Sequence, residues 1–436
     1  MVELSGLSSL ARIVDPVAQR FVDAGFRIYL VGGIVRDLFL AERDGQSSDG
    51  QPFDAAAGDI DLTTDAPPAD IKKLVSPLAE ALWAQGERFG TIGATIDGQA
   101  MEITTHRAEA YDPASRKPVV TFGQDLMEDL SRRDFTINAM AIELPSQTVH
   151  DPYGGVADLE AKLLRTPLSP EISFTDDPLR IMRAARFIAR FDLSPSAELL
   201  ANAVDLAERL SIVSVERVAD ELERLLAVAD PKPGLAFLAD TGTLPIDVGY
   251  DTELSVELAA SATDPVVRRA GLLWPLGDDA RSVLQRLRYS RAATDRTRRL
   301  IESTAQALQS PAEPQAARRI AARVGPDDLP LVSSLVSLVA QHDGRYEAHL
   351  GSTFAATIDQ LASAEDLSDL GSPLTGQMII ETLDVEPGPI IGRAQRFLID
   401  KRLEQGPLSK PEAQQLLQAW WADEKQSQQQ AEQNEN

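Results

Sequence analysis

The hydrophobic periodicity of this chain changes once along its length, and this change constrains the fold more than any other feature of the sequence. Up to about residue 150, short apolar runs, several of them alternating with polar residues, are typical of β-strands and lie between helical segments. From about Ser173 onward, apolar residues recur at spacings of three and four, as on one face of a helix. The pattern predicts a mixed α/β domain followed by an almost entirely helical remainder.

The first part of the chain contains five segments whose patterns predict strands, at 26–33, 59–64, 91–98, 99–106 and 137–144. Two helices are predicted between them. One follows a glycine pair at 34–42, and the other begins with proline at 67–85. The stretch 43–58 is rich in Gly, Ser, Asp and Gln, and it predicts a flexible surface loop.

The composition limits the metal chemistry that this chain can support. It has 436 residues, no cysteine and four histidines, so disulfides and thiolate metal sites are excluded and metal ligands must be mainly carboxylates. Oxygen ligands favour Mg²⁺, with Mn²⁺ as the alternative. No apolar run is long enough for a membrane span, and Glu3 and Asp15 interrupt the stretch where a signal peptide would be apolar, so we expect a cytoplasmic protein.

The segment GDIDLTT places two carboxylates, Asp59 and Asp61, two residues apart in a predicted strand. Alternate side chains of a strand share a face, so both carboxylates lie on one face and Ile60 and Leu62 on the other. Like charges this close repel unless a cation lies between them, which indicates a divalent metal. The alternative is a solvated strand face after a turn. Glu102 lies opposite the apolar Met101 and Ile103 in a second predicted strand, so it is a candidate third carboxylate.

Two further segments carry groups suited to a polyphosphate. In YLVGGIVRD, the glycines Gly32 and Gly33 come between a strand and a helix, so the backbone can approach a ligand at a helix N-terminus, and Arg36 adds a positive charge. In RRDFTINAMA, the guanidinium of Arg133 and the amide of Asn138 can hold triphosphate oxygens or a ribose hydroxyl. A tight turn and a helix capped by aspartate are the alternatives.

Five motifs occur together and in order: VGGIVRD, GDIDLTT, RRDFTINAMA, DPYGGVADL and DDPLRIMRAARF. In this order and wording they resemble the bacterial class II CCA-adding tRNA nucleotidyltransferase and poly(A) polymerase family, strongly over residues 1–225. The resemblance implies an α+β fold with a polymerase β-like nucleotidyltransferase head at 1–150 and a helical neck at 151–250. It also implies a helical body and tail at 251–422, with a degenerate HD-like region. The polar segment 423–436 is predicted to be disordered.

The resemblance also implies an activity, which is addition of CMP and AMP from CTP and ATP to the 3′ end of tRNA. Asp59 and Asp61 would bind two Mg²⁺ ions, with Glu102 as a third catalytic carboxylate. The nucleotide-binding residues implied in this chain are Gly32, Gly33, Arg36, Arg133, Asp134, Asn138, Asp177, Arg180 and Arg183. The sequence carries no indication of the oligomeric state.

The stretch TDDPLRIMRAARF suggests how a base could be chosen without a template. Asp177 and Arg180 are three residues apart, so on a helix they share one face. Asp can accept a hydrogen bond from the amino group of cytosine or adenine, and Arg can donate to the neighbouring ring position. The alternative is an intrahelical salt bridge. Arg183, Arg186 and Arg190 follow along much the same side, where a solvated stripe is also an explanation.

Other readings remain open at the level of sequence. The closest is a poly(A) polymerase or an enzyme restricted to CC or to A, and the segment 106–122 resembles a flexible loop of full CCA-adding relatives. An inactive RNA-binding module and transfer to a small molecule are the others. Net charge is −25, yet seven arginines lie within 281–300, where a solvated helix face competes with a phosphate-binding surface. Trp274 and Pro275 occupy the place of an HD motif, and His342–Asp343 reads as coincidental, so no phosphohydrolase activity is expected.

Overall fold

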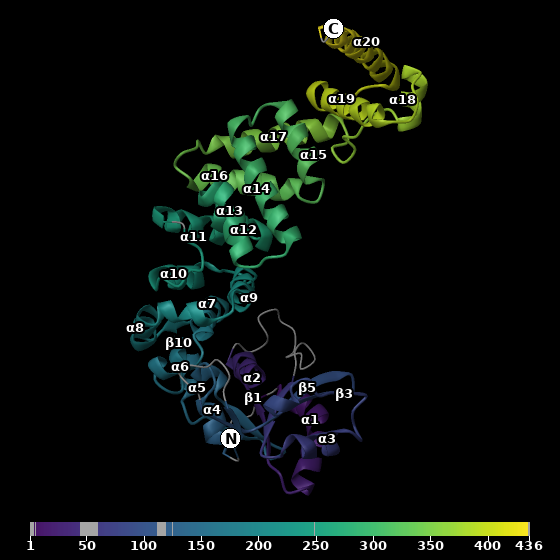
Figure 1. Cartoon of the computed structure of the whole chain (residues 1–436). Helices are drawn as coiled ribbons and strands as arrows, with labels where there is room; N and C mark the ends of the chain where they lie inside the picture. Colours follow the sequence, from purple (N-terminus) through teal and green to yellow (C-terminus); the bar gives the residue numbers. More distant parts are fainter. Residues whose placement is uncertain are drawn as a thin grey trace. The chain divides into compact units, whose positions relative to one another are not determined.

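The computed structural model describes residues 4, 6–43, 60–110, 119–123, 125–247 and 249–434. The chain divides into two compact units, Met1–Pro245 and Ile246–Asn436, which Figure 1 colours from purple to teal and from green to yellow. Asp59 lies outside the described residues. So do residues 44–58 of the predicted surface loop and 111–118 of the segment compared with a flexible loop.

Unit 1 is built on a seven-stranded sheet with the order β3-β4-β5-β2-β1-β8-β9. Its strands are β1 (Ile28–Val31), β2 (Ile60–Thr64), β3 (Ala81–Trp83), β4 (Thr91–Ile96), β5 (Gln99–Thr105), β8 (Ala141–Leu144) and β9 (Thr148–His150). Within the sheet β2 and β5 run parallel, and the other neighbouring pairs are antiparallel. Two further pairs are antiparallel β6 (Arg107–Ala110) with β7 (Val119–Phe122) and parallel β10 (Leu163–Leu164) with β11 (Ser194–Pro195).

The alternation of apolar and polar residues gives the central strands two different faces. Ile60, Leu62, Met101 and Ile103 are buried on the face covered by α1 (Leu7–Asp23) and α3 (Pro68–Val75). Asp61 and its neighbours on β5 alternate with these residues and therefore lie on the opposite face. The mixed α/β head predicted from the sequence is confirmed, and its sheet leaves one face of the central strands for polar groups.

The helix predicted at 67–85 is shorter in the structure. Helix α3 ends at Val75, and the chain continues as the edge strand β3, which pairs with β4. Pro77 follows Ser76 at this point, and a proline both disfavours helical geometry in the residue before it and lacks the N–H that a continuing helix needs. The expectation of one long helix was wrong, and β3 contributes Trp83 to the sheet.

The remaining elements of unit 1 are short helices. They are α2 (Gly33–Arg43), η1 (Glu87–Phe89), α4 (Leu126–Ser131), η2 (Thr136–Asn138), α5 (Gly155–Glu160), α6 (Pro170–Asp176), α7 (Leu179–Phe191), α8 (Ala197–Asp205), η3 (Ala207–Ile212), α9 (Val215–Leu226) and α10 (Lys232–Asp240). Helix α7 packs against both α9 and α10. It is strongly amphipathic, and its apolar side is buried in these contacts.

Unit 2 is helical throughout its described residues, as predicted. Its elements are η4 (Gly249–Asp251), α11 (Thr252–Ser261), α12 (Pro265–Leu273), η5 (Trp274–Asp279), α13 (Ala280–Arg286), α14 (Arg291–Gln309), α15 (Pro314–Val324), α16 (Leu329–His342), α17 (His349–Ala364), α18 (Gly376–Leu383), α19 (Pro389–Gln405) and α20 (Lys410–Asn434). Helix α11 packs on α12, α14 on α15 and α16, and α16 on α17.

The region compared with an HD motif contains a buried polar contact. Trp274 Nε1 donates a 3.0 Å hydrogen bond to Oδ2 of Asp343, whose other donor is the guanidinium of Arg345. Asp343 is only 3% exposed. The aspartate of the His342–Asp343 pair is therefore an internal acceptor that joins the segments around η5 and the end of α16.

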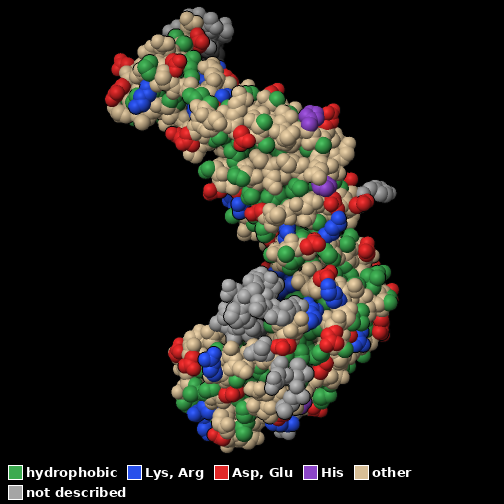
Figure 2. Space-filling model, turned by 180° about the vertical axis from the view of Figure 1, so that it is seen from behind, with side chains coloured by type: hydrophobic (Ala, Val, Ile, Leu, Met, Phe, Trp, Pro, Cys, Tyr) green, Lys and Arg blue, Asp and Glu red, His purple; other side chains and the backbone are tan. Residues whose placement is uncertain are grey.

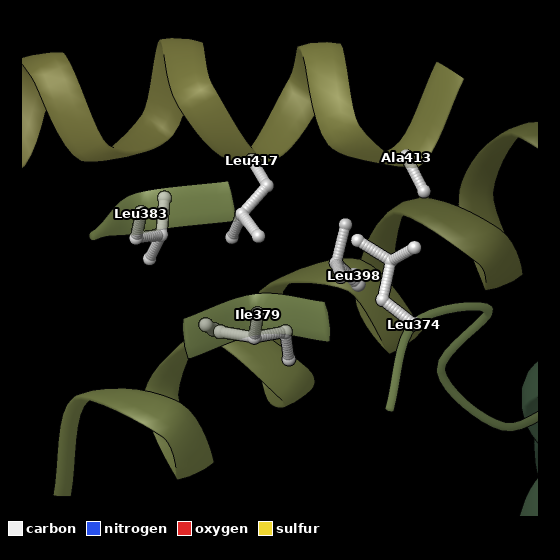
Figure 3. Packing of buried hydrophobic residues seen from close by; sticks show 7 residues of the cluster. Leu374, Ile379, Leu383, Leu398, Ala413 and Leu417 are labelled. Atoms are coloured by element: carbon white, nitrogen blue, oxygen red, sulfur yellow. The ribbon is translucent and has the colours of Figure 1, made fainter. Parts of the chain in front are cut away.

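The last three helices of unit 2 share a small apolar core, in which Leu374, Ile379, Leu383, Leu398 and Leu417 meet (Figure 3). Helix α20 continues to Asn434, through most of the segment for which the sequence predicts disorder. This segment is rich in Gln, Glu and Ala, which are good helix formers, so propensity accounts for the difference.

The described residues contain no helix long and apolar enough to cross a membrane. On the face seen in Figure 2, Asp and Glu side chains are scattered among Lys and Arg side chains over both units. The net charge of −25 therefore leaves individual basic side chains available at many points of the surface.

Candidate active site

The turn between β1 and α2 brings three of the predicted residues together. Gly32 has φ +76°, and a Cβ at this position would lie 3.0 Å from Nη1 of Arg133 and 3.7 Å from Oδ2 of Asp61. Both the left-handed backbone and the crowding require glycine here. The turn, the aspartate and the arginine therefore lie around one point at the N-terminus of α2, where backbone N–H groups favour an anion.

The two described carboxylates of the predicted metal site are direct neighbours in the sheet. Asp61 on β2 pairs in register with Glu102 on the parallel strand β5, so both side chains lie on the same face. Carboxylate oxygens on adjacent strands are donors that suit Mg²⁺ or Mn²⁺. The described part of the site thus fits a divalent cation, and Asp59 lies outside the described residues.

A polar pocket of about 250 Å³ opens beside Asp61. Its lining includes Thr63, Thr104, Asp129, Arg132 and Arg133. Arg133 Nη2 lies 3.3 Å from Oδ2 of Asp129, and Arg133 Nε is buried without a hydrogen-bond partner among the described residues. One edge of the Arg133 guanidinium can therefore still donate to an anionic ligand.

Arg36 lies beneath this pocket rather than on its surface. It is 4% exposed, Nε donates to Asp37 at 2.8 Å, and Nη1 donates to Oδ1 of Asn138 at 2.6 Å. Its guanidinium also stacks 4.2 Å from the ring centre of Phe191. Burial lowers the pKa of Arg36 from its usual value, although Asp37 opposes this effect. The structure gives Arg36 a linking position between α2, η2 and α7, and its predicted contact with phosphate stays a prediction.

Asp134 is the centre of a hydrogen-bond network that continues from Asn138. Its Oδ1 accepts from Nδ2 of Asn138 at 2.9 Å, and its Oδ2 accepts from Nε and Nη2 of Arg183 at 3.0 and 2.5 Å. Burial alone would raise the pKa of Asp134, but the charge of Arg183 and these hydrogen bonds outweigh it, so the pKa lies below its usual value. Asp134 therefore orients Asn138 and Arg183, which both belong to the predicted nucleotide-binding set.

Asp177 and Arg180 do not share a helical face, and that part of the prediction was wrong. Helix α6 ends at Asp176, Asp177 is extended with φ −138° and ψ 96°, and α7 begins at Leu179. Pro178 explains the break, because the residue before proline disfavours helical geometry. The two residues still adjoin, since the Arg180 amide donates to the Asp177 carbonyl at 3.0 Å.

Each of these two side chains has its own supporting contacts. Arg180 donates through Nη1 to Oγ of Ser173 at 2.8 Å and through Nη2 to the carbonyl of Arg132 at 2.5 Å. Asp177 Oδ2 lies 3.3 Å from Nη2 of Arg217. Because Arg132 also lines the pocket beside Asp61, Arg180 is tied directly to the segment that carries the predicted phosphate contacts.

The sequence analysis missed one residue that supports this arrangement. Glu221 on α9 is 4% exposed and accepts from Arg186 Nε at 2.7 Å, while Arg183 Nη1 lies 3.5 Å away. It falls on the stripe that also contains Val218, Leu222 and Leu225, which are all buried. An acid on an apolar stripe is the signal that could have identified a buried charge partner.

His106 is a buried titratable group at the base of the β6–β7 pair. It is 0% exposed, and Nδ1 lies 2.9 Å from Oγ1 of Thr63. The Thr63 hydroxyl donates to the carbonyl of Thr104 at 3.1 Å, so we assign the proton to Nδ1 of His106. Burial lowers the pKa of His106 below its usual value.

This shift predicts a pH dependence of folding. As the pH falls below about 6.5, the unfolded chain binds a proton at His106 before the folded chain does, so the free energy of unfolding decreases by up to about 1.4 kcal/mol per pH unit. Above that pH the contribution is complete. In His106→Phe this part of the slope should disappear, which urea unfolding between pH 5 and 7.5 measures. An unchanged slope in the variant would assign the dependence to other groups.

Comparison with known proteins gives two family matches in unit 1. A model described as Poly A polymerase head domain matches residues 28–165. A second, described as the probable RNA and SrmB-binding site of polymerase A, matches residues 192–246.

Among curated proteins, the CCA-adding enzyme of Lactobacillus helveticus is 39% identical over 228 residues, 52% of this chain and 52% of the relative. That of Geobacillus kaustophilus is 34% identical over 239 residues, 55% of each. The aligned part of the chain thus spans about half the length of the curated relatives it matches.

Solved structures match over a much longer part of the chain. The crystal structure of the Bacillus stearothermophilus CCA-adding enzyme in complex with CTP has a TM-score of 0.71 at 24% identity, over 97% of this chain and 99% of that one. The Thermotoga maritima CCA-adding enzyme complexed with tRNA has a TM-score of 0.64 at 19% identity, over 95% and 96%. At these identities the likeness concerns the fold, which extends from the sheet into the helical part.

Proposed function

Because the chain belongs to the class II CCA-adding enzyme and poly(A) polymerase family, we propose that it adds CMP and AMP from CTP and ATP to the 3′ end of tRNA and releases pyrophosphate. The observation that carries this proposal is the meeting of Asp61, Glu102, Arg133 and the Gly32 turn at one face of the sheet. A carboxylate pair beside a phosphate-binding turn is what nucleotidyl transfer requires.

Each part of this site has a role in the proposal. Mg²⁺ held by Asp61, Glu102 and Asp59 supplies acidification of the attacking 3′-hydroxyl and neutralises charge on the triphosphate; we propose two ions, with Mn²⁺ as the alternative. The Gly32 turn and the N-terminus of α2 receive the triphosphate through backbone N–H groups. Arg133 donates to it through the edge that faces the turn.

Base selection is assigned to Asp177 and Arg180. The Asp177 carboxylate accepts from the exocyclic amino group that cytosine and adenine share, and Arg180 donates to the neighbouring ring acceptor. Guanine and uracil place a donor or acceptor wrongly for this pair. The contacts of Arg180 with Ser173 and the Arg132 carbonyl support the assignment, because they hold a flexible side chain in one orientation.

The helical parts of the chain are proposed to bind the RNA. In this assignment residues 1–150 are the catalytic head, 151–250 the neck and 251–422 the body and tail. The match of 192–246 to an RNA-binding model supports the role of the neck. In the arginine-rich stretch, Arg281, Arg286, Arg288 and Arg291 are exposed on or near α13 and α14, which suits contact with backbone phosphates. Arg296 and Arg298 are instead ion-paired with Asp328 and Glu302.

The proposal is tested by incubating the purified protein with Mg²⁺, a tRNA transcript that lacks its 3′ end, and each of the four nucleoside triphosphates separately. We expect the RNA to lengthen and pyrophosphate to appear with CTP, or with ATP after CTP, and not with GTP or UTP. Long A tails on any RNA would favour a poly(A) polymerase. Binding of RNA without pyrophosphate release would indicate an inactive RNA-binding protein.

A further inference from the structure

An aromatic side chain lies in register with the candidate metal site, three strands away. Trp83 on β3 pairs with Gly93 on β4, Gly93 pairs with Glu102 on β5, and Glu102 pairs with Asp61 on β2. Residues directly opposite each other in a sheet point to the same face. Since adjacent strands are about 4.8 Å apart, Trp83 and Asp61 start about 14 Å apart on one face.

Gly93 allows the indole to close most of this gap. A Cβ on Gly93 would lie 2.0 Å from both Cε2 and Nε1 of Trp83, so the ring occupies the space that any other side chain would fill. The indole therefore lies across β4, and its ring is one strand spacing from Glu102. The absence of a side chain at residue 93 is what places an aromatic surface beside the carboxylates.

A second ring completes a pocket at this place. Trp83, Phe89, Gly93 and Glu102 are among the residues that line a pocket of about 300 Å³. Phe89 is 40% exposed, which core packing does not explain. The guanidinium of Arg88 lies 4.5 Å from the centre of the Phe89 ring, so a positive charge accompanies the aromatic surface. Two aromatic rings with a neighbouring cation are suited to stack a nucleobase next to a phosphate.

The strand order separates this pocket from the nucleotide-binding turn. In the order β3-β4-β5-β2-β1, the β1–α2 turn with Gly32 lies on one side of Asp61, and Trp83 lies on the other side beyond Glu102. A triphosphate at the Gly32 turn therefore leaves the Trp83 side free. The reaction needs a second substrate that reaches the same carboxylates, and this is the RNA end whose hydroxyl is extended.

Building on the proposed function, we propose that Trp83 and Phe89 form the stacking platform for the 3′-terminal base of the acceptor RNA. Stacking holds the terminal ribose with its 3′-hydroxyl toward Glu102 and Asp61. Because every base has an aromatic face, a stacking platform accepts the acceptor end even though its terminal base changes as nucleotides are added. This requirement distinguishes the platform from the base-selecting residues Asp177 and Arg180.

The protein-side test compares Trp83→Ala with Trp83→Phe in the full chain. The alanine variant should raise KM for the RNA acceptor about tenfold and leave KM for CTP and ATP unchanged, because only the acceptor loses a stacking partner. The phenylalanine variant keeps a ring and should remain near wild type. Equal acceptor KM values in all three proteins, or a rise in KM for the nucleotides instead, would overturn the proposal.

The RNA-side test uses the unmodified protein and does not depend on the folding of a variant. An acceptor with an abasic ribose at its 3′ end should be extended about tenfold less efficiently than the normal acceptor by the wild type. Trp83→Ala should show no further loss with the abasic RNA. An abasic penalty that is absent in the wild type, or undiminished in the variant, would contradict stacking at Trp83.

A binding measurement separates failure of this inference from failure of the proposed function. The chain has four tryptophans, so the difference in fluorescence between wild type and Trp83→Phe reports on Trp83. If no RNA is extended, saturable quenching by single-stranded RNA in the wild type, absent from Trp83→Phe, would still support the platform. Identical titrations of the two proteins would reject it. If RNA is extended but the Trp83 variants behave as wild type, the activity stands and the platform is rejected.

Discussion

Asp61→Asn should abolish nucleotide transfer while leaving RNA binding intact. The substitution keeps the size and shape of the side chain and removes the negative charge that pairs in register with Glu102. Loss of a metal-binding carboxylate removes several kcal/mol of transition-state stabilisation, so we expect turnover to decrease about a thousandfold or more. Single-turnover extension of a labelled tRNA measures the rate, and fluorescence anisotropy with the same RNA measures binding.

A matched control is available in the same sheet. Asp97 lies in the exposed turn between β4 and β5 with φ +50°, a conformation that asparagine tolerates well. Asp97→Asn makes the same chemical change and should leave turnover near wild type. Turnover of Asp61→Asn comparable to that of Asp97→Asn would contradict the assignment of Asp61 to the metal site.

Arg180→Ala should weaken the choice of base more than it weakens catalysis. Arg180 is the proposed donor to the base, and a well-placed pair of hydrogen bonds discriminates between bases by up to about 3 kcal/mol. We therefore expect the ratio of kcat/KM for CTP over UTP to fall by up to about a hundredfold. Competition between labelled CTP and UTP at one RNA end measures this ratio directly.

Two further variants distinguish base selection from a general loss of charge. Arg190 lies at the exposed end of the same helix, so Arg190→Ala should keep the wild-type preference. Arg180→Lys keeps the charge but lacks the planar fork that reaches both Ser173 and the Arg132 carbonyl, so it should resemble Arg180→Ala. If Arg190→Ala lost the preference to the same extent, Arg180 would have no special part in base selection.

Local patterns in the sequence were sufficient to predict much of the head. Period-two alternation correctly placed Glu102 on a strand face opposite its apolar neighbours, and the glycine pair marked the strand-to-helix turn. Register between strands cannot be read from such patterns, because it depends on pairing between distant segments. The alignment of Asp61 with Glu102, and of Trp83 with Gly93, therefore became visible only in the folded sheet.

The errors have identifiable physical causes. Residues 81–83 form a three-residue edge strand, which is too short to show its own periodicity against the helical pattern before it. The break at Asp177 was signalled by Pro178, and the spacing of the two charged residues was given more weight than the proline. The Asp134–Arg183 contact joins residues 49 positions apart, so no local pattern could predict it.

The measurement that tests the central claim most directly follows single additions to three tRNA transcripts, ending at the discriminator base, after C and after CC. With CTP, ATP and Mg²⁺ together, the account predicts that each transcript is extended to CCA and that extension then stops. With CTP alone, the first two should gain C and the third should not. Long A tails, A addition only after CC, or no extension of any transcript would contradict the claim that this chain adds CCA.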